Sequence, residues 1–152
     1  MKVRDVMTRN PICCLPTDSA MEAARIMKSR DVGAVPIVAD RDSGRLIGIV
    51  TDRDLCKAIV AEGDSPQFTL VEKVMRRNPF TCGPEDSVES CERLMQKHQV
   101  RRIPVVDKNG RCIGIVAQAD VALHAPPAQV AKTLVAVSKP SRRRPARRAV
   151  AA

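Results

Sequence analysis

Two short apolar runs, at residues 34–38 and 46–50, flank a polar segment that ends in Gly44. Runs of this length on either side of a polar, glycine-containing turn are typical of two strands paired as a hairpin. A further short apolar run at 12–14 comes well before the hairpin. The pattern therefore predicts three strands in the first third of the chain.

Helical patterns separate and follow these strands. Ser19 and Glu22 match a capping box, which predicts a helix from there to residue 30. A second helix is expected from residue 52 to about 61. The unit then reads β-α-β-β-α. Within the first helix, Met21, Ala24, Met27 and Lys28 continue at helical spacing to Arg30.

The same unit occurs twice. Residues 3–38 match residues 71–106 with 15 identities in 36 positions, and residues 44–54 match 110–120 with 7 in 11. The spacing differs by two residues between the blocks because the first copy has the longer hairpin turn, where length variation costs little. One copy of about 60 residues would bury only a small core, so we expect the two copies to pack together.

Breaker residues set the expected limits of the units. Turn-forming residues at 62–70 connect the copies, and Ala-Pro-Pro at 125–127 ends the second. A stripe of Val130, Leu134 and Val137 then predicts one short amphipathic helix. The expected organisation is repeat 1 at 1–67, repeat 2 at 68–125, the short helix at 126–138 and a disordered basic tail at 139–152.

Composition and charge limit the function classes. The aromatic content is 1%, so a base-stacking surface for single-stranded nucleic acid is not expected. The net charge is +9, but seven basic residues and no acidic ones follow residue 120, which leaves the body nearly neutral. No apolar stretch approaches the ~20 residues that span a bilayer, and no secretory signal opens the chain. We therefore expect a soluble cytoplasmic protein.

No catalytic or metal-binding pattern stands out. The six cysteines lack Cys-x-x-Cys spacing and are expected to be reduced and mostly buried. His98 and His124 have no cysteine or serine at a telling spacing, so we expect them at helix ends. A P-loop and a Gly-x-Ser-x-Gly motif are also absent. The prediction is a protein without enzyme activity and without a metal site.

The most suggestive local feature is the junction Gly48-Ile-Val-Thr51-Asp-Arg-Asp54, where a strand meets a helix. With Thr51 as N-cap and Asp54 three residues on, the helix start presents backbone N–H groups and a positive dipole end, which favour phosphate. A carboxylate at this place can accept hydrogen bonds from two ribose hydroxyls. Gly48 leaves room for another backbone or a ligand.

The alternative is that Thr51 and Asp54 only cap their own helix, which is worth about 1 kcal/mol. The repeat weighs against this interpretation. The acid recurs as Asp120, whereas the capping hydroxyl is replaced by Ala117. If capping were the whole purpose, the hydroxyl should have been kept and the acid lost.

Together, several motifs resemble a tandem pair of CBS (cystathionine β-synthase) domains. They are the doubled unit, the opening Val-Met-x-x-Asn-Pro, the segment Val-Arg-Arg-Ile-Pro-Val-Val at 100–106 and Gly-Ile-Val-Thr-x-x-Asp, within residues 1–124. The resemblance implies an α+β fold of two repeats about a pseudo-twofold axis. It also implies a regulatory module that binds adenosyl ligands between the repeats and commonly forms a homodimer. The implied ligands, none obligatory, are AMP, ADP, ATP, S-adenosylmethionine and sometimes NAD.

The resemblance also implies two sites. In the first, Asp54 would hold the ribose and Thr51 the phosphate, with the adenine facing Ile12, Cys13 and Cys14. In the second, Asp120 would hold the ribose, with Phe80, Thr81 and Cys82 near the base. Ala117 departs from the pattern, so we expect this site to be weak, empty or selective for a ligand without phosphate there.

Arg101 and Arg102 have no basic counterparts in the first copy, which has Gly33 and Ala34 at these places. In the family this segment lines the cleft, and arginine suits phosphate geometrically. We predict that at least one of them contacts phosphate in the Thr51/Asp54 site. The alternative is two solvated charges at the entry to a strand.

These observations favour a sensor of adenine nucleotides that acts on an unknown effector protein. Two other interpretations stay open. In one, the repeats are a dimerisation module with vestigial pockets. In the other, the arginine run at 142–148 binds nucleic acid electrostatically and the repeats only dimerise. The alternative for this arginine run is a disordered tail that only increases solubility.

Overall fold

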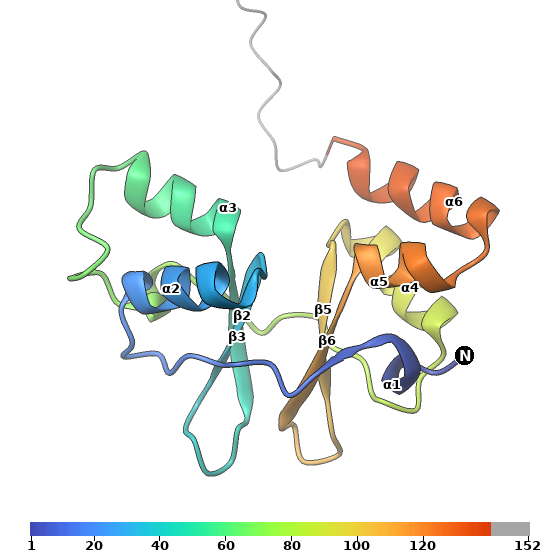
Figure 1. Cartoon of the computed structure of the whole chain (residues 1–152), viewed down its shortest axis with the longest axis horizontal. Helices are drawn as coiled ribbons and strands as arrows, with labels where there is room; N and C mark the ends of the chain where they lie inside the picture. The colour runs from blue at the N-terminus through green and yellow to red at the C-terminus, as the bar shows by residue number, and fades with distance from the viewer. Residues whose placement is uncertain (141–152) are drawn as a thin grey trace, which may run out of the picture.

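The computed structural model describes residues 1–140. The basic run at 142–148 and the rest of the expected tail beyond residue 140 lie outside the described residues. Two halves of similar build lie side by side, each with a hairpin at one end and helices at the other (Figure 1). This mixed arrangement of helices and two small sheets confirms the expected fold class.

The elements of each half follow the predicted order. The first half contains α2 (Ala20–Arg30), β2 (Ala34–Val38), β3 (Leu46–Thr51) and α3 (Asp52–Leu55), which continues as the π-helical turn η1 (Cys56–Val60). The second half contains α4 (Val88–His98), β5 (Arg102–Val106), β6 (Cys112–Ala117) and α5 (Gln118–His124). The strand expected at 12–14 is reduced to a single parallel bridge, from Cys14 to Ile37.

The capping prediction for α2 is confirmed, and the start of the helix sets which face is buried. The Ser19 hydroxyl accepts a hydrogen bond from the N–H of Glu22 at 3.2 Å. With the helix started there, Ala20, Ala23 and Met27 face the core. Ala24 and Lys28 are exposed because they lie beside the buried face, on the side turned toward solvent.

Each sheet takes its third strand from the segment that precedes the other repeat's core. The sheet orders are β2-β3-β4 and β1-β6-β5. Strand β4 (Arg76–Arg77) pairs with β3, and β1 (Thr8–Arg9) pairs with β6. The chain therefore crosses between the halves twice, once before α2 and once before α4 (Figure 1).

The N-terminal helix α1 (Val3–Val6) accordingly belongs to the second core. Val3 and Val6 are buried there, and the N–H of Val3 donates to the carbonyl of Asp86 at 2.9 Å. Its counterpart, the 3₁₀ turn η2 (Val71–Lys73), buries Val71 in the first core in the same way. Each of these two segments thus packs in the core of the other predicted repeat. The limits 1–67 and 68–125 remain a prediction about the chain.

Two glycines make the strand exchange possible. A Cβ on Gly48 would lie 2.6 Å from Sδ of Met75 and 3.0 Å from the carbonyl oxygen of Arg76. A Cβ on Gly114 would meet Met7 and Thr8 in the same manner, at 2.5 and 3.1 Å. Gly48 was expected to admit a backbone or a ligand, and the structure places the backbone of β4 there.

The turn ends of the two hairpins are hydrogen-bonded to each other. The N–H of Leu46 donates to the carbonyl of Gly110 at 3.0 Å, and the N–H of Cys112 donates to the carbonyl of Gly44 at 2.9 Å. Leu46 and Cys112 are equivalent in the repeat, as are Gly44 and Gly110. This pair of reciprocal bonds relates the halves by the pseudo-twofold axis.

The helix expected near the C-terminus is present as α6 (Pro127–Ser138) and packs on α4. The predicted stripe is wrong at Leu134, which is 49% exposed, because the helix turns Thr133 and Val137 inward. Thr133 and Gln129 bind the carboxylate of Glu92, which is buried in α4. A buried acid needs such partners, and this requirement sets the rotation of α6. No helix within residues 1–140 is long and apolar enough to cross a membrane.

Gly48→Ala tests the close approach of the exchanged strand. The added methyl group has to displace the backbone of β4, so we expect a loss of about 1–3 kcal/mol in the free energy of unfolding. Urea denaturation measures this loss. The matched control is Gly83→Ala, where the nearest atom lies at an ordinary 3.7 Å. Equal effects of the two substitutions would contradict the explanation.

Val137→Ala and Leu134→Ala test the orientation of α6. Val137 is 6% exposed within the second core, so its truncation should cost about 1–3 kcal/mol. Truncation of the half-exposed Leu134 should stay within about 0.5 kcal/mol. The measurement is again the free energy of unfolding, and the reverse ranking would restore the stripe expected from the sequence.

Candidate functional site

The junction between β3 and α3 holds a complete capping box. The Thr51 hydroxyl accepts from the N–H of Asp54 at 3.1 Å, and Oδ2 of Asp54 accepts from the N–H of Thr51 at 3.0 Å. The side chain of Asp54 is 12% exposed. Its carboxylate is therefore fixed in place by one oxygen, which leaves the other available for a second partner.

That second partner is Arg76 on the exchanged strand β4. Its Nε and Nη2 donate to Oδ1 of Asp54 at 3.2 and 3.1 Å. The Arg76 side chain is 62% exposed, and an ion pair with so much water around it contributes at most about 1 kcal/mol. A ligand that competes for Oδ1 therefore has only a weak contact to displace.

The equivalent junction between β6 and α5 keeps only half of the capping box. Oδ2 of Asp120 accepts from the N–H of Ala117 at 2.7 Å, but Ala117 has no hydroxyl to return the bond. The other carboxylate oxygen of Asp120 has no hydrogen-bond partner among residues 1–140. Asp120 is thus positioned like Asp54 but has fewer hydrogen-bond partners.

After each exchanged strand the chain returns to the half that the sequence predicted for it. Beyond β1, the N–H of Cys14 donates to the carbonyl of Pro36 at 3.0 Å, and Cys14 bridges to β2 in the half that carries Asp54. Beyond β4, the N–H of Cys82 donates to the carbonyl of Pro104 at 3.2 Å, and Cys82 bridges to β5 in the half that carries Asp120. The contacts of these segments with a ligand stay a prediction.

The six residues expected near adenine differ in exposure. Cys14 and Cys82 are buried, and each bridges to an outer strand of a sheet, at Ile37 of β2 and Val105 of β5. Ile12 is 39% exposed and Cys13 is partly exposed, as the lining of a site requires. On the other side Thr81 is exposed and Phe80 is 46% exposed.

Phe80 stacks on His98, with ring centroids 3.6 Å apart. His98 ends α4, as predicted, but its contact with Phe80 had no signal in the sequence. The two residues are far apart in the chain, and only the return of α4 to the segment after β4 brings them together.

Arg101 and Arg102 line a cavity of about 300 Å³ over the start of α5, with Ala117, Gln118, Ala119 and Ala122. Arg102 also reaches the other repeat, because a Cβ on Gly33 would lie 2.3 Å from its Nη2. The same Cβ would lie 3.1 Å from Oδ2 of Asp52, directly after Thr51. Gly33 therefore leaves the space that the Arg102 guanidinium occupies between the repeats.

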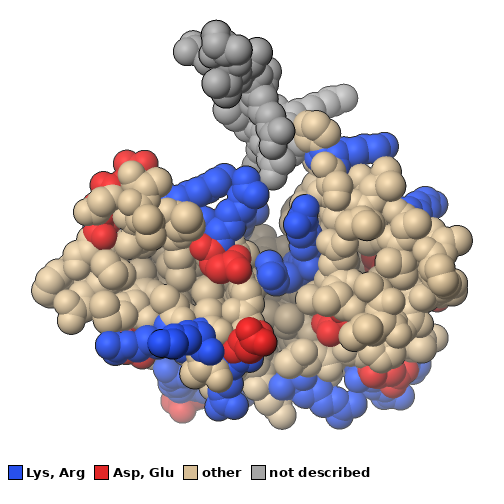
Figure 2. All heavy atoms as spheres, turned by 45° about the horizontal axis from the view of Figure 1, so that its top comes forward, with Lys and Arg blue, Asp and Glu red and all other residues tan. Residues whose placement is uncertain are grey.

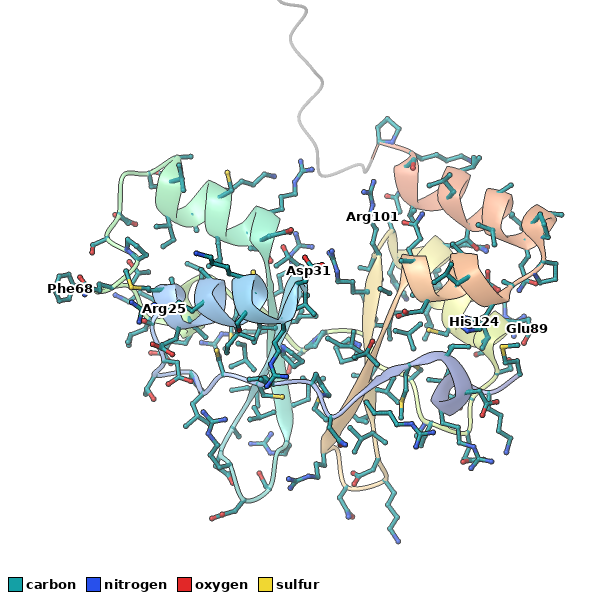
Figure 3. The ribbon with its side chains drawn as sticks, viewed as in Figure 1. Arg25, Asp31, Phe68, Glu89, Arg101 and His124 are labelled. Atoms are coloured by element: carbon teal, nitrogen blue, oxygen red, sulfur yellow. The ribbon has the colours of Figure 1, made fainter. Side chains whose placement is uncertain are left out.

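The surface between the halves is hollowed, and Lys and Arg side chains gather on both of its walls (Figure 2). Arg101 lies on the β5 side of this gap and Asp31 on the opposite side (Figure 3). A second cavity of about 300 Å³ lies at the hairpin end, where Arg45, Leu46 and Thr81 are among its lining residues. Within residues 1–140, no group of three or more His, Cys, Asp or Glu side chains is placed to hold a metal ion.

Comparison with known proteins gives consistent matches. A family model described as CBS domain matches residues 3–61 and 71–126. The CBS domain-containing protein YhcV of Bacillus subtilis is 39% identical over 122 residues, which are 80% of this chain and 84% of YhcV. A crystal structure of the CBS domain pair of protein MJ0100, in complex with 5′-methylthioadenosine and S-adenosylmethionine, is 32% identical with a TM-score of 0.72. That match covers 81% of this chain and 94% of the other. CBSX2 in complex with AMP matches at 26% identity and a TM-score of 0.67, over 82% and 95%.

Reciprocal substitutions at the two junctions test the difference between their caps. Thr51→Ala should lower the free energy of unfolding by about 1 kcal/mol, and Ala117→Thr should raise it by a similar amount, because a hydroxyl at the N-cap satisfies one helix N–H. Urea denaturation measures both, with Thr17→Ala at an exposed turn as control. No gain from Ala117→Thr would show that the two junctions are not equivalent.

Proposed function

The chain belongs to the CBS domain family, and on that premise we propose that it is a regulatory module that binds an adenosyl ligand between its repeats. The ligand class comprises AMP, ADP, ATP, S-adenosylmethionine and NAD. The bound state acts on a partner protein or on a second copy of the chain. The module does not itself catalyse a reaction, and its proposed location is the cytoplasm.

The observation that carries the proposal is the pair of equivalent acids at the ends of β3 and β6. Asp54 and Asp120 each fix one carboxylate oxygen on the backbone N–H three residues before. The remaining oxygen of each acid can accept hydrogen bonds from the vicinal hydroxyls of a ribose. The capping role of Asp120 uses only one of its oxygens, and the acid is kept although its junction lacks the hydroxyl of a full capping box.

The strand exchange supplies each acid with a wall from the other repeat. We assign Asp54 to one site with Arg76 and the segment that carries Ile12, which runs on to pair with β2. We assign Asp120 to another site with the segment that carries Phe80, which runs on to pair with β5. The partly exposed Ile12 and Phe80 offer apolar surface to an adenine ring. An adenosyl ligand in either site would therefore touch both repeats.

Arg102 is the proposed phosphate contact. Its guanidinium lies between Gly33 and the cavity at the start of α5, so it is within the space that separates the two junctions. Arginine binds phosphate with two parallel hydrogen bonds. Arg101, which is more exposed, offers a second positive charge at the mouth of the same cavity.

Regulation then follows from contacts with both repeats. A ligand that binds one relative packing of the repeats more tightly shifts the population toward it, and by no more than its difference in affinity. The solved structures with 5′-methylthioadenosine, S-adenosylmethionine and AMP support the adenosyl class for this chain by similarity.

A thermal-shift panel of AMP, ADP, ATP, S-adenosylmethionine and NAD tests the proposal. A ligand at about 100 times its Kd adds about 2.7 kcal/mol of stability, which raises the midpoint of this chain by roughly 5–10 °C. Asp54→Asn and Asp120→Asn should reduce the rise, because each keeps an acceptor for the backbone N–H and loses the charge and one ribose acceptor. The variant that abolishes the rise identifies the occupied site.

Two further variants provide a control and a test of the proposed phosphate contact. Asp42→Asn removes an acid on the exposed hairpin turn and should leave every shift unchanged. Arg102→Ala should weaken AMP, ADP and ATP more than S-adenosylmethionine, which has no phosphate. If no adenosyl compound raises the midpoint of the folded, nucleotide-free chain, the sensor function is wrong.

A further inference from the structure

Two cysteines from different parts of the chain lie near each other at the turn end of the second hairpin. Cys13 follows β1 on the way to α2, and Cys112 is the first residue of β6. The N–H of Asn10 donates to the carbonyl of Ile113 at 3.0 Å, which continues the pairing of β1 with β6 toward Cys112. The Cys13 thiol donates to the carbonyl of Pro11 at 3.4 Å, and the same pairing, continued past Asn10, brings Pro11 opposite Cys112. Both cysteine side chains are partly exposed.

The repeat places the equivalent residues in one neighbourhood as well. Thr81 is the counterpart of Cys13, and Leu46 is the counterpart of Cys112. Thr81 and Leu46 line one cavity on their own side of the pseudo-twofold axis. Only the other half carries sulfur at both of these positions.

The surroundings of Cys13 are electropositive. Nη1 of Arg41 donates to the Cys13 carbonyl at 3.2 Å, and Nη1 of Arg111 donates to the carbonyl of Asp42 at 2.7 Å, on the turn that carries Arg41. Interaction with the Cys112 thiol and these two positive charges lower the pKa of the Cys13 thiol. Interaction with the Cys13 thiol and burial raise the pKa of the Cys112 thiol. Cys13 is thus the member of the pair that ionises first.

The other cysteines lack this combination of features. Burial raises the pKa of Cys14 to about 12. The Sγ atoms of Cys82 and Cys91 lie 3.8 Å apart, but both residues are buried in the second core. The hydrogen bond between these thiols and burial raise the pKa of Cys91. Cys56 is exposed and has no neighbouring thiol among residues 1–140.

We infer that Cys13 and Cys112 are a thiol pair that a hydroperoxide converts to a reversible disulfide. Reactive thiols occupy partly exposed, electropositive places such as this one. The bond ties the segment that carries Ile12 to the start of β6, and so fixes the crossing from β1 to α2 against the second sheet. This inference does not depend on the proposed ligand.

The oxidation balances in two steps. The Cys13 thiolate attacks one peroxide oxygen, the O–O bond breaks, and hydroxide leaves Cys13 as a sulfenic acid. That hydroxide takes the proton of Cys112. The Cys112 thiolate then attacks Sγ of Cys13 and displaces a second hydroxide, which takes up the proton that Cys13 released when it ionised. The two sulfurs lose two electrons in total, and the peroxide oxygens gain them.

Peptide mapping of the full chain tests the inference. The reduced protein, in a Cys56→Ser background that removes the exposed thiol, is treated with a molar excess of hydrogen peroxide and digested with trypsin without reductant. We expect the peptide of residues 10–25 to be joined to that of residues 112–132, with the loss of two hydrogen atoms. Fragmentation between Cys13 and Cys14 shows which of them carries the bond, and dithiothreitol should release it.

Three further variants in the same background complete the test. Cys13→Ser and Cys112→Ser should abolish the cross-link, and Cys14→Ser should leave it unchanged. The cross-link is mapped in the Cys56→Ser protein itself, where Cys13 and Cys112 are unchanged. The result therefore does not depend on whether a further variant folds. The inference is wrong if peroxide yields no cross-link, a Cys13–Cys14 bond, a Cys82–Cys91 bond alone, or a link that survives Cys13→Ser.

Discussion

The exchange of third strands is the constraint on which the rest of this structure depends. β1 completes the sheet of the second repeat and β4 completes the sheet of the first, so neither sheet has its full set of strands without the other repeat. Gly48 and Gly114 permit the exchange because any Cβ at these positions would press on the incoming strand. The two halves therefore form one cooperative body, and the clefts between them exist only in the assembled pair.

The same exchange decides the composition of the candidate sites. An acid from one repeat is joined to a strand that the chain delivers from elsewhere, as Asp54 is joined to Arg76. A ligand held by such a site contacts both crossings of the chain. That arrangement gives a small molecule a direct means of changing how the repeats pack, because the surfaces that it touches are the surfaces that hold the halves together.

Departures from the internal symmetry are where individual chemistry is found. The first junction has the hydroxyl of Thr51 and the second has Ala117, so two equivalent acids have different surroundings. Arg101 and Arg102 have no basic counterparts, and Gly33 leaves space for one of them. Cys13 and Cys112 stand where the other half has Thr81 and Leu46. Each difference adds a charge, a donor or a thiol to a scaffold that the duplication would otherwise make equal on both sides.

The sequence by itself determined the repeat, the order of elements within it and the family, because apolar periodicity, capping residues and turn residues are local signals. Ser19 starts its helix as predicted, its counterpart Ser87 starts the equivalent helix of the second copy, and the hairpins form where the apolar runs lie. The acids Asp54 and Asp120 were identified because the duplication preserved them. Only the tertiary structure decided that Arg76 of β4 contacts Asp54, since β1 and β4 cross between the repeats and no local pattern records a crossing. It also decided the inward turn of Thr133 in α6 and the meeting of Cys13 with Cys112. Each of these depends on contacts between residues far apart in the chain, which are settled by the packing of the whole rather than by any neighbour in sequence.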